Sequence, residues 1–95
     1  MADASVPAPR IVRIVNTKGL HARASAKFVQ CAGRYEATVT VQRDGHAVVG
    51  TSIMGLMMLG AGIGSELSLS AEGPQATEAL DALQALIEGK FGEDS

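Results

Sequence analysis

The chain has 95 residues, which is enough for one small domain with a single modest core. Its net charge of −2, without a basic patch interleaved with aromatic residues, argues against a nucleic-acid-binding surface. The single cysteine, Cys31, excludes an internal disulfide bond. The chain shows no signal-peptide pattern and no apolar run near the roughly 20 residues that span a bilayer. We therefore expect a cytoplasmic protein.

Two hydrophobic periodicities alternate along the first half of the chain. Residues 10–16 alternate between apolar and polar side chains, as a β-strand does. Residues 22–32 place small and apolar side chains on one face of a helix, and Gly33 is suited to end it. Residues 35–42 alternate again. The pattern therefore predicts a strand, a helix and a second strand.

Two local signals organise the middle of the chain. Asp44 and Gly45 predict a type I′ hairpin turn because both residues tolerate a positive φ. Residues 46–49 are then the return strand. Ser52 is a favourable N-cap for a short helix that ends at Leu59, before a cluster of glycines.

The last part of the chain predicts one more strand and one more helix. Residues 66–71 alternate between inward leucines and outward serines. Pro74 is expected at the first helical position, where its missing N–H is no disadvantage. Apolar residues then recur at helical spacing as far as Ile87.

The element order β-α-β-β-α-β-α sets the expected architecture. Strands with one polar face imply a sheet that is covered by helices on its other face only. We therefore predict an α/β (α+β) open-faced sandwich with a four-stranded antiparallel sheet. This domain is expected over residues 10–91, between a flexible leader at 1–9 and a flexible tail at 92–95.

Residues 19–23 (GLHAR) are the most informative short segment. They place an imidazole and a guanidinium where a strand pattern changes to a helix pattern. The free N–H groups and the dipole of a helix N-terminus stabilise an anion there. His21 can act as a nucleophile, and Arg23 can donate to phosphoryl oxygens. The alternative interpretation is a capping loop whose histidine merely lies at the surface.

Three segments together resemble the HPr family, the histidine-containing phosphocarrier proteins of the bacterial phosphotransferase system. They are GLHAR at 19–23, SIMGLMMLG at 52–60 and SAEG at 70–73, and the likeness extends over most of residues 10–91. The resemblance implies that His21 accepts, on Nδ1, a phosphoryl group that enzyme I takes from phosphoenolpyruvate. His21 would then pass it to EIIA-type acceptors.

Two further positions are interpreted through this resemblance. The family usually has proline after the arginine, whereas Ala24 keeps an N–H that could donate to the phosphoryl group. Ser52 matches the serine that HPr kinase/phosphorylase modifies in members with a Ser-Ile-Met-Gly setting. Its residues alone indicate an N-cap, and both roles can hold together.

The helix after Ser52 is too apolar to bury every side chain. Three residues spaced along one face are expected in the core: Leu56, Leu59 and Ile63. Three others are left for an exposed face: Ile53, Met54 and Met57. The resemblance assigns this exposed face, together with Leu20, to docking of enzyme I, the acceptors and the kinase.

The alternatives concern the role rather than the fold. One is a mainly regulatory member of the nitrogen-related branch that acts through protein binding. A different class is a ferredoxin-like module that binds a small ligand and needs no nucleophile. A metal enzyme is disfavoured because two separated histidines and one cysteine form no ligand set. We expect a monomeric carrier that is not a free-standing enzyme and has no metal, cofactor, nucleic-acid or membrane partner.

Overall fold

The computed structural model describes residues 6–95, so most of the predicted leader at 1–9 lies outside the described residues. Within that range the strands and helices follow the predicted order, with an added 3₁₀ helix near the C-terminal end. The elements are β1 (Arg10–Arg13), α1 (Ala22–Ala32), β2 (Thr38–Arg43), β3 (His46–Val49), α2 (Ile53–Met58), β4 (Glu66–Glu72), α3 (Ala76–Glu88) and η1 (Lys90–Gly92).

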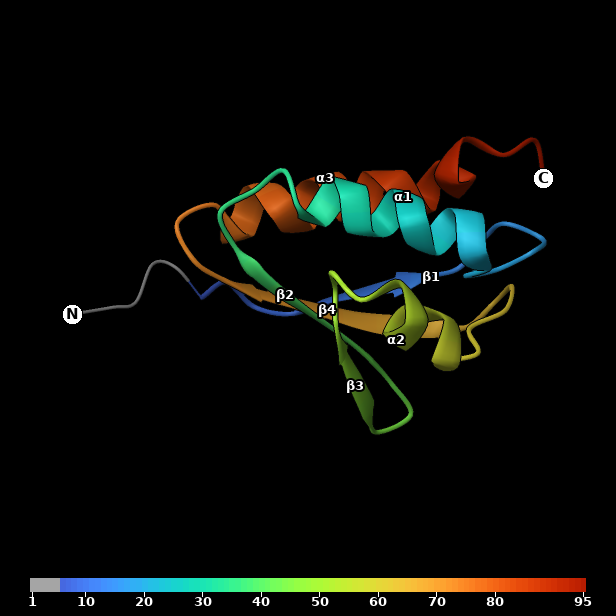
Figure 1. Cartoon of the computed structure of the whole chain (residues 1–95), viewed down its shortest axis with the longest axis horizontal. Helices are drawn as coiled ribbons and strands as arrows, with labels where there is room; N and C mark the ends of the chain where they lie inside the picture. The colour runs from blue at the N-terminus through green and yellow to red at the C-terminus, as the bar shows by residue number, and fades with distance from the viewer. Residues whose placement is uncertain (1–5) are drawn as a thin grey trace.

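The strands form one antiparallel sheet in the order β1-β4-β2-β3. Helices α1 and α3 lie side by side across one face of this sheet, as Figure 1 shows. The short helix α2 contacts α1 and β3. The prediction of an open-faced sandwich with a four-stranded antiparallel sheet is confirmed.

Alternation along the central strands explains why the helices cover only one face. On β4, Leu67, Leu69 and Ala71 are buried, and the serines between them lie on the opposite face. Val39 and Val41 of β2 pair with Ala71 and Leu69, so the apolar faces of the two strands coincide. Removing this continuous surface from water is the main driving force for placing α1 and α3 there.

Local signals in the sequence predicted several boundaries correctly. Helix α1 begins and ends where the periodicity indicates. Asp44 and Gly45 have φ values of 50° and 83°, as a type I′ turn requires, and the pair between Arg43 and His46 closes the two-residue hairpin. These features depend on neighbouring residues only, which is why they could be read from the sequence.

Helix α3 begins later than predicted. Its first residue is Ala76 rather than Pro74, which lies in the preceding turn. The turn is held by Gln75, whose N–H donates to the Glu36 carbonyl at 3.0 Å and whose Oε1 accepts from the Glu36 N–H at 2.8 Å. This docking onto the loop before β2 keeps Pro74 and Gln75 out of the helix.

The predicted core face of α2 is correct for two residues and wrong for the third. Leu56 and Leu59 are buried, but Ile63 is 61% exposed. The helix ends at Met58, and Gly60 then turns the chain with a φ of 65°. Helical spacing therefore does not extend to Ile63, and its side chain faces solvent.

Candidate functional site

The loop between β1 and α1 is held by the buried Asn16 and by the segment that follows α2. The Asn16 Nδ2 donates to the Gly19 carbonyl at 2.9 Å, and the Leu20 N–H donates to the Ala61 carbonyl at 2.9 Å. Gly19 has a φ of 65°, and a Cβ there would lie 2.4 Å from the Ala61 oxygen. Glycine is therefore required for the loop to approach this segment.

His21 is the N-cap residue of α1. Its backbone is extended and its carbonyl accepts from the Ser25 N–H at 2.8 Å, which is the first hydrogen bond of the helix. Its side chain makes no capping hydrogen bond. The N–H groups of Ala22, Arg23 and Ala24 precede that first bond and have no intrahelical acceptor. Ala22 and Arg23 are exposed, so an anion beside the imidazole can approach this end of the helix, whereas Ala24 is buried.

The structure places the Ala24 side chain in the core, where it is fully buried. Its N–H is the third of the three at the start of α1, and Ala24 is not among the residues that line the hollow beside the ring, so its role as a donor stays a prediction. The Arg23 side chain is exposed and forms no ion pair within residues 6–95. Its guanidinium is therefore free to turn toward a bound phosphoryl group.

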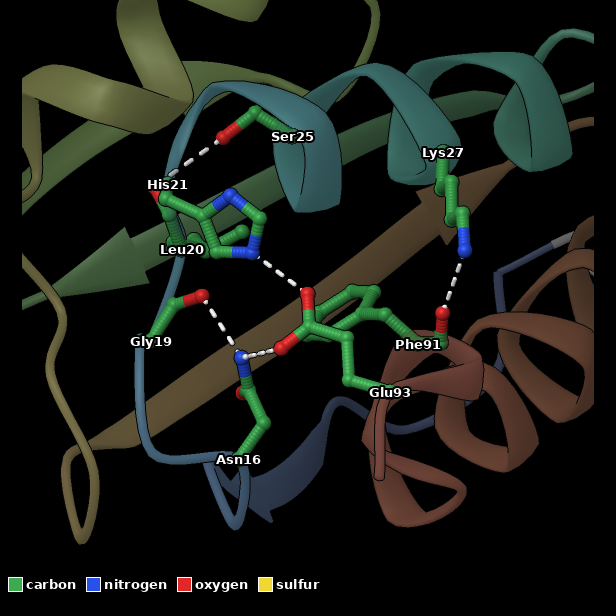
Figure 2. A network of polar contacts seen from close by, with 8 residues as sticks. All are labelled: Asn16, Gly19, Leu20, His21, Ser25, Lys27, Phe91 and Glu93. Carbon is green, nitrogen blue, oxygen red and sulfur yellow. Dashed lines mark hydrogen bonds and ion pairs between the residues drawn. The ribbon is translucent and has the colours of Figure 1, made fainter. Parts of the chain in front are cut away.

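A carboxylate from the C-terminal segment contacts the His21 ring, as Figure 2 shows. The His21 Nε2 hydrogen-bonds to Glu93 Oε2, and the Asn16 Nδ2 donates to Glu93 Oε1 at 3.0 Å. These two hydrogen bonds, with that from His21 the larger effect, lower the pKa of the Glu93 carboxyl. Glu93 therefore holds its negative charge firmly beside the imidazole.

The sequence did not reveal the contribution of Asn16 and Glu93. Residues 92–95 were expected to form a flexible tail; in the structure Glu93 lies against the site and a backbone oxygen of Ser95 accepts from the Thr17 N–H at 3.2 Å. Asn16 and Glu93 are far apart in the chain and belong to no motif. Only the fold brings them together at His21.

A surface hollow of about 640 Å³ opens beside the ring. Its charged lining includes three cations, Lys18, Arg23 and Lys27, and two carboxylates, Glu93 and Asp94. The Lys27 Nζ donates to a backbone carbonyl at 2.7 Å, which ties α1 to the C-terminal segment. The hollow thus places the His21 ring among side chains of both signs, of which the exposed Lys18 and Arg23 suit an anionic group.

Ser52 is confirmed as the N-cap of α2. Its Oγ accepts from the Gly55 N–H at 3.0 Å, and its side chain is half-buried. A Cβ on Gly55 would lie 3.0 Å from that oxygen and 3.1 Å from Val48 Cβ. The cap is therefore closely packed around the Ser52 hydroxyl.

The apolar residues expected on the outer face of α2 are exposed, namely Ile53, Met54 and Met57. Met58 is also exposed, although the sequence interpretation did not include it. Leu20 is only 5% exposed and belongs to the hydrophobic core, so its assignment to this outward surface is wrong. The physical reason is that burying this apolar side chain is favourable, and the bond from the Leu20 N–H to the loop after α2 holds this part of the chain beside the core.

Two other kinds of feature are absent from residues 6–95. No helix in this range is long and apolar enough to cross a bilayer. The same residues contain no group of three or more histidine, cysteine, aspartate or glutamate side chains arranged to hold a metal ion.

Comparisons with known proteins agree with this geometry. A family model described as the PTS HPr component phosphorylation site matches residues 9–89. The phosphocarrier protein HPr of Cupriavidus necator is 54% identical over 84 residues, covering 88% of this chain and 94% of that protein. HPr of Pseudomonas aeruginosa is 53% identical over 83 residues, covering 86% and 92%. The crystal structure of HPr-C-His from Thermoanaerobacter tengcongensis superposes with a TM-score of 0.89 at 44% identity, covering 94% of this chain and all of that one.

Proposed function

This chain belongs to the HPr family of phosphocarrier proteins of the phosphotransferase system, and from that premise we propose that His21 is its phosphoryl-carrying residue. The donor is enzyme I, which is charged by phosphoenolpyruvate, and the receivers are EIIA-type acceptors. One observation carries the proposal: the His21 ring stands at the start of α1 beside three N–H groups without intrahelical acceptors. The exposed guanidinium of Arg23 lines the same hollow.

The chemistry needs little beyond position and charge. A lone pair on the His21 ring attacks phosphorus while the bond between phosphorus and the donor breaks, and that bond's electron pair leaves with the donor. The N–H groups at the start of α1, including that of Ala24, and the Arg23 guanidinium stabilise the charge on the three phosphoryl oxygens. The second transfer, to the acceptor, is the same step in reverse.

The exposed side chains of Ile53, Met54, Met57 and Met58 form the docking surface for the partner proteins. Helix α2 contacts α1, so this surface lies close to the helix that begins at the reactive ring. Flexible methionine side chains adapt to partners of different shape. A carrier that must meet a donor and several acceptors needs such a surface.

Ser52 adds regulation to the same surface. HPr kinase/phosphorylase is the enzyme that would modify its hydroxyl, which caps the helix bearing the docking surface. A phosphate there adds about −1.5 to −2 charges next to Ile53 and Met54. An enzyme I surface that carries an anionic phosphoryl group is repelled by this charge, and the apolar contact is lost as well.

The test is transfer from purified enzyme I with Mg²⁺ and phosphoenolpyruvate, followed by location of the phosphate. The adduct is expected on His21, labile in acid and stable in alkali, and His21→Ala abolishes it. His46→Ala is the matched control, because His46 is the other histidine and is exposed on the hairpin. Label that stays in the His21→Ala variant would overturn the proposal.

A further inference from the structure

The contact between Glu93 and the His21 ring plays no part in the proposal above, and it indicates how the ring is prepared for the reaction. We propose that Glu93 is a positioning residue that keeps the hydrogen of the neutral His21 ring on Nε2 and leaves the lone pair on Nδ1. The inference rests on the proposed function of His21 and deepens it by naming the group that leaves the lone pair on Nδ1, the atom that the family resemblance already implies.

Hydrogen-bond chemistry leads to this tautomer. An ionised carboxylate can only accept a hydrogen bond, so the Nε2 atom facing Glu93 must donate one. A neutral imidazole carries a single N–H, so its Nδ1 then holds the free lone pair. Figure 2 shows the other ring nitrogen directed away from Glu93. The lowered pKa of the Glu93 carboxyl keeps this group an acceptor at neutral pH.

The Glu93 carboxylate is itself held in place. The buried Asn16 Nδ2 donates to Glu93 Oε1 at 3.0 Å and to the Gly19 carbonyl at 2.9 Å, so one amide joins the C-terminal segment to the loop that precedes His21. Phe91 is buried two residues before Glu93, and its carbonyl accepts from the Lys27 Nζ at 2.7 Å. The carboxylate therefore approaches the ring from a fixed direction.

The arrangement also suits the charge that develops during transfer. When Nδ1 bonds to phosphorus and the donor takes the electron pair of its own bond, the Nε2 hydrogen stays on the ring and the ring becomes positive. The Glu93 carboxylate lies against that hydrogen and stabilises the positive ring. The catalytic triads of hydrolases use the same arrangement: a carboxylate that is hydrogen-bonded to one imidazole nitrogen fixes the tautomer and stabilises the imidazolium.

The other charged side chains that line the hollow form no hydrogen bond or ion pair with the ring. Lys18, Arg23, Lys27 and Asp94 share this lining, but among residues 6–95 only Glu93 hydrogen-bonds to the His21 ring. Lys18 contributes a small part of the lowering of the Glu93 pKa. Asp94 therefore provides a matched control, since it is the adjacent carboxylate in the same hollow.

The experiment has a spectroscopic arm that needs no phosphoryl donor. Long-range ¹H–¹⁵N correlation spectra of ¹⁵N-labelled protein at neutral pH report which ring nitrogen of His21 carries the hydrogen. We expect Nε2–H in the wild type and in Asp94→Ala, and a mixture of tautomers in Glu93→Ala. A wild-type ring with its hydrogen on Nδ1, or a Glu93→Ala ring unchanged from the wild type, would overturn the inference.

The kinetic arm measures transfer from enzyme I with the same proteins. Glu93→Ala is expected to lower kcat about tenfold, the effect of losing one hydrogen bond to a charged group. The KM of enzyme I for this protein stays unchanged because Glu93 is outside the docking surface. Glu93→Gln keeps the side-chain length without the charge and should give an intermediate kcat; both variants must show wild-type backbone amide spectra.

The two proposals fail in different ways. If the wild type acquires no phosphate on His21, the proposed function fails whatever the tautomer is. If the wild type is phosphorylated normally and both Glu93→Ala and Glu93→Gln transfer at its rate, the positioning role of Glu93 fails and the carrier function stands.

Discussion

The substitution Met54→Asp tests the docking surface most directly, because the structure predicts a large effect on binding and a small one on stability. Met54 is 68% exposed, so only about a third of the roughly 1.5–3 kcal/mol from burying a methionine is lost, or about 0.5–1 kcal/mol. The new carboxylate lies in the first turn of α2, where its interaction with the helix dipole stabilises the fold by about 0.3–1 kcal/mol. The free energy of unfolding should therefore change by less than about 1 kcal/mol.

The effect on association is expected to be larger. An apolar contact becomes a carboxylate that must be desolvated at the interface, which costs more than the ~1 kcal/mol of a peripheral contact. The KM of enzyme I for this protein should then rise by more than about fivefold, with kcat little changed. Steady-state transfer to His21 gives both constants, and thermal unfolding gives the stability.

A matched control separates docking from a general loss of exposed apolar surface. Ile11 on β1 is 64% exposed and lies on the face of the sheet away from the helices, since its neighbour Val12 is buried in the core. Ile11→Asp should leave the KM of enzyme I for this protein unchanged. Equal KM values for Met54→Asp and the wild type would refute the docking surface, and a stability loss of several kcal/mol would show that Met54 supports the core.

Three other predictions each concern a single residue. Ser52→Ala removes the N-cap bond and should lower stability by ~1 kcal/mol and the Tm by about 4–8 °C, with normal transfer to His21, whereas Ser52→Asp should slow transfer through weaker association. High salt should relieve the Ser52→Asp defect by screening the repulsion, and a defect that is the same at all salt concentrations would contradict this mechanism. Arg23→Ala should lower kcat and leave the Tm unchanged, because the side chain is exposed and makes no ion pair within the part of the chain described; unaltered kinetics would show that Arg23 is only a surface residue. Folding lowers the pKa of Glu93, so its stabilising contribution is present above the ordinary glutamate pKa and is lost as the pH falls through the lowered value. The stability difference between the wild type and Glu93→Ala, measured by denaturant unfolding over a pH series, should therefore shrink in acid.

Much of the fold could be predicted because its signals are local. The bounds of α1, the turn at Asp44 and Gly45 and the cap at Ser52 each depend on residues within one turn or one hairpin. The alternation along β2 and β4 also predicted which face of the sheet is buried, since side chains on a strand alternate whatever the partner strand is. The place of His21 at a helix start made it a candidate nucleophile, and the resemblance to the HPr family, rather than this position alone, indicated that it carries the phosphoryl group.

The features that the sequence alone could not provide all depend on contacts between distant segments. The family resemblance placed Leu20 with the docking surface, but its side chain is buried in the core and its N–H donates to the loop after α2. Pro74 had the sequence of a helix start, and docking of Gln75 onto the loop before β2 delays the helix. Glu93 belongs to a segment with no pattern at all. Its carboxylate reaches the His21 ring only because the buried Phe91 and the amide of Asn16 hold the end of the chain there, and such a meeting of segments is decided by packing rather than by any local sequence preference.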